Sequence, residues 1–307
     1  MSAQSARFKK INSPKKVLVI GSAVIDVVVT IPSIPRSGGD VFASNEEVIV
    51  GGCAYNVGNI LQQLNANYDL MVPIGSGTQA DTIKKQMKID GHRVMLKDLE
   101  GDNGWCLCMV ENDGERTFLT VPGIEHEWKD DWFDQVNVDE YDYIYLSGYS
   151  FEGPSAEVIL KQLRKKREDT VIIFDPSPRV SEMNREHLDA LLTMGTIIHG
   201  NRDELTTITG ENDVETAARQ LNKWTKQPVI ITLGAEGTLV AEDGVVNICS
   251  GHKVDLVDTI GAGDTHTGAF ITALLDDQTM QVACEWGNDA AAKVVQIQGG
   301  KVDLFEN

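Results

Sequence analysis

The segment DTIGAGDTHTGAF, residues 258–270, places one carboxylate, Asp264, directly after Gly261, Ala262 and Gly263. The two glycines permit a tight turn with unobstructed N–H groups, and the small and apolar residues at 269–275 predict a helix. A glycine-rich turn at a helix N-terminus attracts anions through its N–H groups and the helix dipole. Asp264 is therefore either an acid favoured by that dipole or a reactive group beside a bound anion. This segment alone leaves both interpretations open.

The whole chain has 307 residues, a net charge of −19 and five cysteines. The acidity disfavours a nucleic-acid surface or an anionic membrane as partner, because both bind basic faces. It does not exclude a phosphorylated ligand, which backbone donors can hold inside an acidic protein. The cysteines are scattered, and neither a Cys-x-x-Cys pair nor a histidine pair stands at metal-ligand spacing. We therefore expect reduced thiols in a cytoplasmic protein.

Short apolar runs alternate with amphipathic stretches along most of the chain. The runs lie at 16–21, 68–73, 141–148, 170–175, 195–201 and 228–234. Near-continuous runs of this kind are typical of strands buried on both faces of a parallel sheet. Helical patterns lie between them, at 54–64, 80–89, 156–166, 182–194 and 214–224. This alternation predicts βαβ units in a single α/β domain over residues 16–307, after a disordered polar tail at 1–15.

Two segments, 24–50 and 104–121, break this alternation because they are strand-like with no helix between the strands. VFASNEEVIV (41–50) alternates apolar and polar residues, as a half-exposed strand does. The second segment predicts a hairpin that turns at Asn112, Asp113 and Gly114. We expect a small antiparallel sheet that projects from the main one as a lid. Its edge strands suit pairing in a homodimer.

Four further motifs accompany the opening segment in a fixed order: GSAVIDV (21–27), GGCAYNVG (51–58), NRDE (201–204) and TLGAEG (232–237). Together, from about residue 16 to residue 300, they resemble the PfkB, or ribokinase-like, family of carbohydrate kinases. Ordered motifs in combination are far more specific than any one of them. The resemblance implies a three-layer αβα domain with a mostly parallel central sheet. It also implies ATP-dependent phosphorylation of a hydroxyl on a small sugar or sugar-like substrate.

The resemblance assigns roles at the opening segment. Asp264 is implied as the base that takes the proton from the attacking hydroxyl. The N–H groups of Gly261, Ala262 and Gly263 are implied to stabilise charge on the transferred phosphoryl group. This chemistry is sound, because phosphoryl transfer requires positioning and charge stabilisation more than covalent help. A carboxylate beside an anion-binding turn is useful when the bound anion is the electrophile.

The acceptor pocket is implied to include Asp26, Gly51, Gly52 and Asn56. Asp26 is expected to accept hydrogen bonds from substrate hydroxyls. Its alternative, an exposed turn carboxylate, is weakened by the apolar neighbours in AVIDVVV. The alternative interpretation of Asn56 is that it is only a polar residue on the surface of a helix.

The lid is expected to determine the substrate. Asn103, Trp105 and Arg116 are candidates to contact it. An arginine suits a carboxylate or a phosphate on the substrate, although on an exposed hairpin it is more often only solvated. The substrate itself is not named by the sequence.

On the nucleotide side, the resemblance implies that Thr232, Gly234 and Gly237 approach ATP where larger side chains would clash. Asn288 aligns with a position that often faces adenine, and its alternative is a solvated helix residue. The resemblance also implies that Asn201 binds ATP. Asn201 lies three residues before Glu204.

Asn201 and Glu204 also match a helix capping box, and in the family such a pair orders Mg²⁺-bound water and phosphate. Both roles are compatible, because Mg²⁺ keeps most of its waters and requires few carboxylates. The carbonyls of Asp258 and Ile260, with others near 297–299, match the family's loop for a monovalent cation such as K⁺.

Three positions depart from the family pattern. His266 replaces the usual Phe, and we expect it to pack, because residues two apart on a helix do not face the same way. Ser177 replaces Asn in DPSPR, which leaves the geometry around Arg179 uncertain. Gln79 stands where the family has Asp.

Two alternatives remain beside the sugar kinase. A nucleoside kinase uses the same motifs with an aromatic pocket for the base. A catalytically silent sugar- or nucleotide-binding regulator keeps the fold, but the intact Gly-Ala-Gly-Asp motif argues against it. A dinucleotide oxidoreductase is a poor third choice, because the first strand lacks Gly-x-Gly-x-x-Gly.

Overall fold

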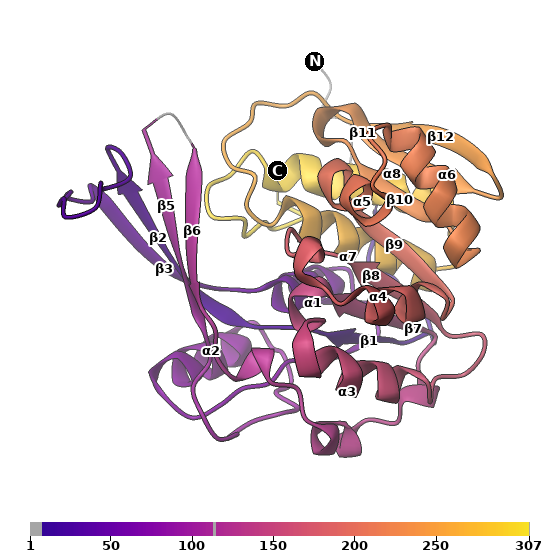
Figure 1. The fold of residues 1–307 in the computed structure, drawn as a ribbon, viewed down its shortest axis with the longest axis horizontal. Coiled ribbons are helices and arrows are strands. Elements are labelled where there is room, and N and C mark those ends of the chain that lie inside the picture. The colour runs from indigo at the N-terminus through magenta and orange to yellow at the C-terminus, as the bar shows by residue number, and fades with distance from the viewer. Residues whose placement is uncertain (1–7, 113–114, 307) are drawn as a thin grey trace.

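The computed structural model describes residues 8–112 and 115–306, and its central feature is an eight-stranded sheet (Figure 1). The strand order is β12-β11-β10-β9-β8-β7-β1-β4. From β10 to β4 all neighbours are parallel, whereas β11 pairs antiparallel with both β10 and β12. In chain order the strands are β1 (Val17–Ile20), β4 (Tyr68–Met71), β7 (Tyr143–Ser147), β8 (Val171–Asp175), β9 (Thr196–Asn201), β10 (Val229–Thr232), β11 (Gly237–Glu242) and β12 (Val245–Ser250).

Helices cover both faces of this sheet. On one face lie α1 (Cys53–Gln63), α2 (Thr78–Ile89), α7 (Ala262–Leu275) and α8 (Met280–Val294), and on the other α3 (Gly153–Leu163), α4 (Arg185–Leu192), α5 (Arg202–Thr209) and α6 (Val214–Thr225). Alternate residues of β1 belong to the two cores, Val17 and Val19 to one and Leu18 and Ile20 to the other. A strand buried on both faces gives this pattern. The fold is thus the predicted three-layer αβα arrangement.

Short 3-10 helices lie in the connections, at Ile124–His126, Asp130–Gln135, Val138–Glu140, Gly148–Ser150, Val180–Glu182 and Gly234–Glu236. In the described parts of the chain, no helix combines the length and apolar character needed to cross a bilayer.

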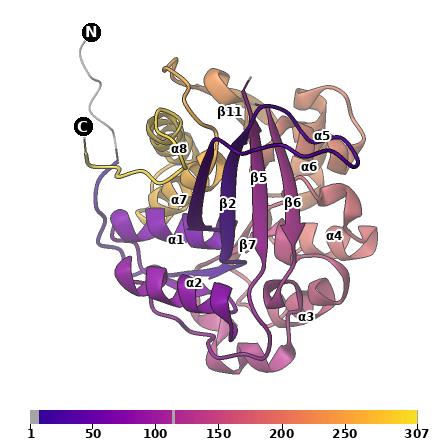
Figure 2. The same ribbon diagram turned by 90° about the vertical axis from the view of Figure 1, so that its left-hand side faces the viewer.

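The second sheet stands in front of the first in Figure 2 and forms the predicted lid. Its order is β3-β2-β5-β6, with β2 (Val24–Ile31), β3 (Asn45–Gly51), β5 (Trp105–Glu111) and β6 (Arg116–Val121). The predicted antiparallel pairing is present between β2 and β3 and between β5 and β6, whereas β2 and β5 pair in parallel. Both strands leave the main domain at the same end, so they run outward together, and β3 and β6 return beside them. Asp113 and Gly114 of the predicted turn lie outside the described residues.

One hairpin of the main sheet was not predicted. β11 and β12 are joined by Asp243 and Gly244, both with positive φ (49° and 77°), which is the geometry of a two-residue hairpin turn. The hairpin adds two antiparallel strands to the edge of the sheet.

Residues 8–15 also differ from the disordered tail expected for 1–15. Phe8 and Ile11 are buried, and the Phe8 ring meets those of Trp286 and Phe305 edge to face. Burial of these two apolar side chains fixes the segment against α8 and the C-terminal residues.

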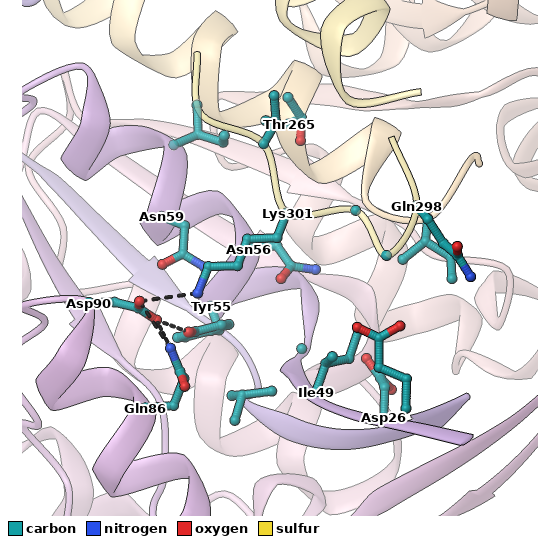
Figure 3. Close-up of a pocket in the computed structure, with 18 of the residues that line it drawn as sticks. Asp26, Ile49, Tyr55, Asn56, Asn59, Gln86, Asp90, Thr265, Gln298 and Lys301 are labelled. Atoms are coloured by element: carbon teal, nitrogen blue, oxygen red, sulfur yellow. Dashed lines mark hydrogen bonds and ion pairs between the residues drawn. The ribbon is translucent and has the colours of Figure 1, made fainter. Parts of the chain in front are cut away.

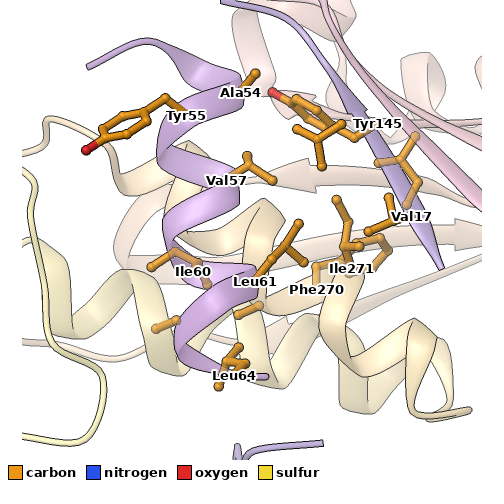
Figure 4. Close-up of a cluster of buried hydrophobic side chains, with 14 of the residues drawn as sticks. Val17, Ala54, Tyr55, Val57, Ile60, Leu61, Leu64, Tyr145, Phe270 and Ile271 are labelled. Atoms are coloured by element: carbon orange, nitrogen blue, oxygen red, sulfur yellow. The ribbon is translucent and has the colours of Figure 1, made fainter. Parts of the chain in front are cut away.

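Helices α1 and α7 pack against each other very closely (Figure 4). A Cβ atom at Gly268 of α7 would lie 2.6 Å from Cβ of Ile60 on α1, so only glycine fits there. Ala54, Val57 and Leu61 of α1 belong to the same apolar cluster as Phe270 and Ile271 of α7. This contact holds the N-terminal turns of the two helices beside each other.

Candidate active site

Helix α7 begins at the glycine-rich turn that the sequence singles out. Gly261 is its N-cap with φ of 70°, a left-handed conformation that favours glycine. The Ala262 N–H donates to the Thr259 carbonyl at 3.2 Å and so closes the turn. Of the three predicted anion-binding N–H groups, that of Ala262 is therefore engaged within the loop itself.

Asp264 lies in the first turn of α7 and contacts α1. Nδ2 of Asn56 donates to its carboxylate at 2.7 Å, so these two predicted site residues, 208 positions apart, do meet. Burial raises the pKa of Asp264 to about 6, against the opposing effect of hydrogen bonds from Asn56 and Cys53. A carboxylate with such a pKa is ionised at neutral pH and still basic enough to accept a proton.

Asp26 lies close enough to Asp264 for the two charges to interact. Burial, and then the negative charge of Asp264, raises the pKa of Asp26 to about 7. Gly51 makes room for this carboxylate, because a Cβ at that position would collide with Oδ2 of Asp26. Gly52 has φ of 101°, and a Cβ there would lie 2.6 Å from the Ser22 carbonyl. The glycine pair thus fixes the backbone beside Asp26.

A cavity of about 520 Å³ lies between the lid strand β3, helices α1 and α2 and the loop at 298–302; we call it the lid-side cavity (Figure 3). Asp26, Gly51 and Asn56 of the predicted acceptor pocket line it, together with Ile260. In Figure 3 Asp26 and Ile49 lie on the right of this cavity, with Asn56 above them. Three of the predicted acceptor residues are therefore brought together in one cavity, whereas Gly52 does not line it.

The other end of the lid-side cavity contains a cluster that the sequence did not reveal. Tyr55 donates its hydroxyl to Asp90, which also accepts from Nε2 of Gln86 at 3.0 Å and from Nζ of Lys301 at 3.1 Å. Asn59 lines the same end. No motif joins these residues, which come from α1, α2 and the C-terminal loop.

A second cavity, of about 280 Å³, lies on the other side of the glycine-rich turn against α8; we call it the α8-side cavity. It brings together the predicted residues Thr232, Gly234, Gly237 and Asn288 with Ala262 and Gly263 of the turn. Its remaining lining is mostly small or apolar: Ala235, Gly251, His252, Val254, Leu256, Thr259, His266, Ala291, Ala292 and Val295. Glycine-lined walls of this kind allow a ligand to approach the backbone closely.

Asn288 is not the solvated helix residue of the alternative interpretation. Its side chain is buried, accepts from the Thr238 hydroxyl at 2.7 Å and donates to the Cys249 carbonyl at 3.1 Å. It therefore belongs to the wall of the α8-side cavity.

Asn201 and Glu204 form the predicted capping box at the start of α5. The Asn201 side chain accepts from the Glu204 N–H at 2.9 Å, and the Glu204 carboxylate accepts from the Asn201 N–H at 2.8 Å. Neither residue lines the α8-side cavity. Burial, followed by the charges of Glu204 and Asp264, raises the pKa of Asp175 well above its ordinary value. The Asp175 carboxyl therefore lies within electrostatic reach of both Glu204 and Asp264.

These carboxylates suit a magnesium ion held through water and phosphate. Within residues 8–112 and 115–306, no group of three or more His, Cys, Asp or Glu side chains converges on one point as a direct metal cage does. Mg²⁺ bound with a nucleotide keeps several waters and takes only one or two carboxylates, so the arrangement fits it.

The lid candidates do not reach the lid-side cavity. Trp105 packs against the main apolar core, and Asn103 is buried with its amide bonded to the backbone of Ala23, Pro73 and Gly75. Neither residue, nor Arg116, is among the lining residues. Asn103 therefore supports the loop structure.

Arg116 instead joins the lid to the loop that precedes the glycine-rich turn. Its guanidinium donates to Oδ1 of Asp258 at 2.7 Å and to Oγ1 of Thr259 at 2.8 Å. The buried Asp258 carboxylate also accepts from the N–H groups of Ile260 (2.7 Å) and Gly299 (3.1 Å). Arg116 thus supplies the positive charge that this buried carboxylate requires.

Two of the three departures from the family pattern, His266 and Ser177, have defined contacts in the structure, and nothing in the structure explains Gln79. His266 is buried and bonded to Thr238 and His199, so it packs as expected. Ser177 has φ of 63°, and its N–H donates to Asp175 at 3.3 Å. Arg179 forms a two-point ion pair with Glu152.

Comparison with known proteins identifies relatives of this chain. Residues 14–304 match the family model described as pfkB family carbohydrate kinase. The chain is 31% identical to the uncharacterised sugar kinase YegV of Escherichia coli, over 95% of this chain and 92% of that protein. It is 27% identical to a ribokinase of Haemophilus influenzae, over 94% and 95%. A probable sugar kinase from Rhizobium etli has a similar fold, with a TM-score of 0.82 at 19% identity over 95% and 97% of the two chains. The chain belongs to the pfkB family of carbohydrate kinases.

Proposed function

We propose that this kinase phosphorylates a hydroxyl of a small sugar at the expense of ATP, with Asp264 as the catalytic base. The observation that carries the proposal is the position of Asp264 in a turn whose residues line two cavities. Ile260 and Thr265 line one cavity and Ala262 and Gly263 line the other, while Asp264 itself lines neither. One cavity is lined by Asp26 and Asn56, and the other by glycines and small apolar residues. An acceptor in the first and a nucleotide in the second would meet at this carboxylate.

In the proposed mechanism, Asp26 accepts hydrogen bonds from hydroxyls of the sugar and so orients it. Asp264 takes the proton of the attacking hydroxyl, and Asn56 holds the Asp264 carboxylate for that transfer. The attacking oxygen forms its bond to the γ-phosphorus as the bond to the ADP oxygen breaks. The turn at Gly261–Gly263 and the α7 dipole stabilise the negative charge on the transferred group.

Mg²⁺ is proposed to bind with the nucleotide and to neutralise phosphate charge when present. Glu204, with Asp175 beside it, is proposed to hold its waters, since both carboxylates lie near Asp264. The K⁺ at the carbonyls of Asp258 and Ile260 stays a prediction.

The lining of the lid-side cavity favours a sugar over a nucleoside as acceptor. Of the described residues that line it, only Tyr55 is aromatic, and its side chain is 1% exposed with the hydroxyl bound to Asp90. A nucleobase is usually held by an exposed ring face, which Tyr55 does not offer. Carboxylates and amides at both ends suit hydroxyl groups.

The predicted homodimer through the lid also remains a proposal. Large apolar side chains of the lid are exposed, namely Phe42, Val48, Phe118 and Leu119. Apolar groups gathered on edge strands suit pairing with a second copy. The cytoplasmic location stays a prediction.

The proposed function is tested by ADP release over a panel of pentoses, hexoses, sugar acids and nucleosides, with the wild type and Asp264→Asn. We expect turnover with a neutral sugar and a fall in kcat of about 10²- to 10⁴-fold in the variant, the usual contribution of a general base. ATP binding, measured by calorimetry, should persist. A variant that turns over like the wild type would exclude Asp264 as the base.

A further inference from the structure

A continuous chain of buried hydrogen bonds runs from the α8-side cavity to the first turns of α7. Asn288 Oδ1 and Thr238 Oγ1 are 2.7 Å apart, and Thr238 Oγ1 and His266 Nε2 are 2.9 Å apart. His266 Nδ1 then lies 2.8 Å from Nε2 of His199, whose Nδ1 lies 3.1 Å from the hydroxyl of Thr267. All five side chains are at most 7% exposed, so water does not compete for these bonds.

The amide of Asn288 fixes the direction of every bond in this chain. Its Nδ2 group donates to the Cys249 carbonyl, so its oxygen faces Thr238 and accepts the hydroxyl proton. The Thr238 oxygen accepts from Nε2–H of His266, whose Nδ1 in turn accepts from Nε2–H of His199. Burial lowers the pKa of both rings, that of His266 to about 4. Both histidines are therefore neutral and carry their proton on Nε2.

The far end of the chain lies at the peptide group that precedes the proposed base. The Thr267 hydroxyl is 3.1 Å from Nδ1 of His199 and 2.9 Å from the carbonyl oxygen of Gly263, so the two acceptors share its proton. The Gly263 carbonyl belongs to the same planar peptide as the N–H of Asp264. The hydrogen-bond chain therefore ends on the backbone that joins the glycine-rich turn to the base.

Helix α8 holds the middle of the chain in place. A Cβ atom at Gly287 would lie 2.5 Å from Cε1 of His266, so this ring fills the space that glycine leaves. His266 also lines the α8-side cavity beside Asn288. The ring cannot shift without disturbing either the cavity wall or His199.

We propose that His266 and His199 are positioning residues for phosphoryl transfer, which hold the Gly263–Asp264 peptide in a fixed place relative to the nucleotide through this hydrogen-bond chain. The inference rests on the proposed function, because it gives Gly263 and Asp264 their roles at the transferred group. Displacement of a reacting group by about 1 Å can cost about 10²-fold in rate. Neither imidazole exchanges a proton with the substrate.

The test begins with His266→Phe, which keeps a ring of similar size and leaves Nε2–H of His199 without an acceptor. We expect kcat to fall about 10- to 100-fold, as for other residues that orient reacting groups. KM for the acceptor should change little, because His266 does not line the lid-side cavity. His266→Gln, which can donate to Thr238 and accept from His199, should recover most of kcat. Gly287→Ala removes no hydrogen-bonding group but pushes on the ring, and should also lower kcat.

Thr170→Val is the control for a merely structural role. Thr170 is buried like His266, its hydroxyl donates to the Tyr141 carbonyl at 2.7 Å, and it lines neither of the two cavities. We expect Thr170→Val to lower Tm without lowering kcat. If His266→Phe lowers Tm as Thr170→Val does and keeps the wild-type kcat, the chain is only structural and the proposal is overturned.

A spectroscopic readout separates this inference from the proposed function. Imidazole ¹⁵N resonances should show neutral Nε2–H tautomers for both His199 and His266 at neutral pH. A charged ring, or an Nδ1–H tautomer at either residue, would overturn the chain even in an active kinase. Failure of the proposed function appears differently, as a wild type that releases no ADP with any acceptor.

Discussion

The two cavities on either side of the start of α7 differ in the polar groups that line them. The lid-side cavity presents carboxylates and amides, with Asp26 and Asn56 at one end and Gln86 and Asp90 at the other. The α8-side cavity presents glycines, alanines and a few apolar side chains around Asn288. One ligand is thus recognised through polar side chains, and the other mainly through shape and backbone.

Because of this difference, we expect the two cavities to differ in how many substitutions they tolerate. A polar side chain that meets a hydroxyl can be replaced by another polar side chain, so the lid-side cavity can change its ligand while the catalytic turn stays intact. A wall formed by backbone and glycine tolerates far fewer substitutions, because every added atom occupies ligand space. Variants on each side should therefore affect one substrate and spare the other.

We expect Asp26→Ala to give the largest difference between its effect on KM for the acceptor and its effect on KM for ATP. Loss of hydrogen bonds to a charged group costs about 1.5–3 kcal/mol, so KM for the acceptor should rise about 10- to 100-fold. KM for ATP should change little, because Asp26 does not line the α8-side cavity. Steady-state kinetics with each substrate varied in turn measures both values. An unchanged acceptor KM would remove Asp26 from the pocket.

The reciprocal variant is Ala292→Phe, on the α8 wall of the second cavity. Its ring would occupy part of the 280 Å³, and crowding of this kind costs about 1–3 kcal/mol. KM for ATP should therefore rise by about tenfold, with the acceptor KM unaffected. Ala290 is buried two positions earlier in the same helix outside the cavity, and Ala290→Gly serves as a control that alters the helix alone. Equal effects on both substrates would contradict the separation of the two sides.

The smallest effect concerns pH and stability. The pKa of Asp26 is raised to about 7 and that of Asp264 to about 6, both from 3.8. The folded protein therefore binds protons that the unfolded chain has released, and its free energy of unfolding falls as pH rises from about 4 to about 7. Asp26→Asn, which carries no charge, should have a higher Tm than the wild type at pH 8. Thermal denaturation should show this gap closing towards pH 4; a constant gap would contradict the raised pKa.

The main features of the fold follow from the sequence pattern, because buried parallel strands have an unmistakable composition. All six predicted runs contain a strand of the main sheet. The hairpin of β11 and β12 was missed although Asp243-Gly244 between apolar runs is a hairpin signal. The parallel pairing of β2 with β5 depends on where the strands leave the main sheet, which local sequence does not encode.

The candidate site also contains some residues that the sequence predicts and others that only the folded structure brings together. Asp264, Asn56 and the glycines belong to motifs of fixed spacing, so they can be predicted as site residues from the sequence. Tyr55, Gln86, Asp90 and Lys301 meet only after folding, because they come from segments up to 246 positions apart with no motif between them. Arg116 likewise finds its partner Asp258 only when the lid lies against the domain. Tertiary ion pairs of this kind leave no local signal.

The absence of a side chain at Gly268 limits which substitutions this enzyme can accept during evolution. The proposed base stands on one helix and the amide that holds it on another, and the two backbones touch where residue 268 has only a hydrogen. A single methyl group there would wedge the helices apart and lengthen the Asn56–Asp264 bond, although it touches neither substrate. Substitutions at residues that line the cavities can therefore change substrate specificity, whereas the contact between α1 and α7 at Gly268 tolerates no larger side chain.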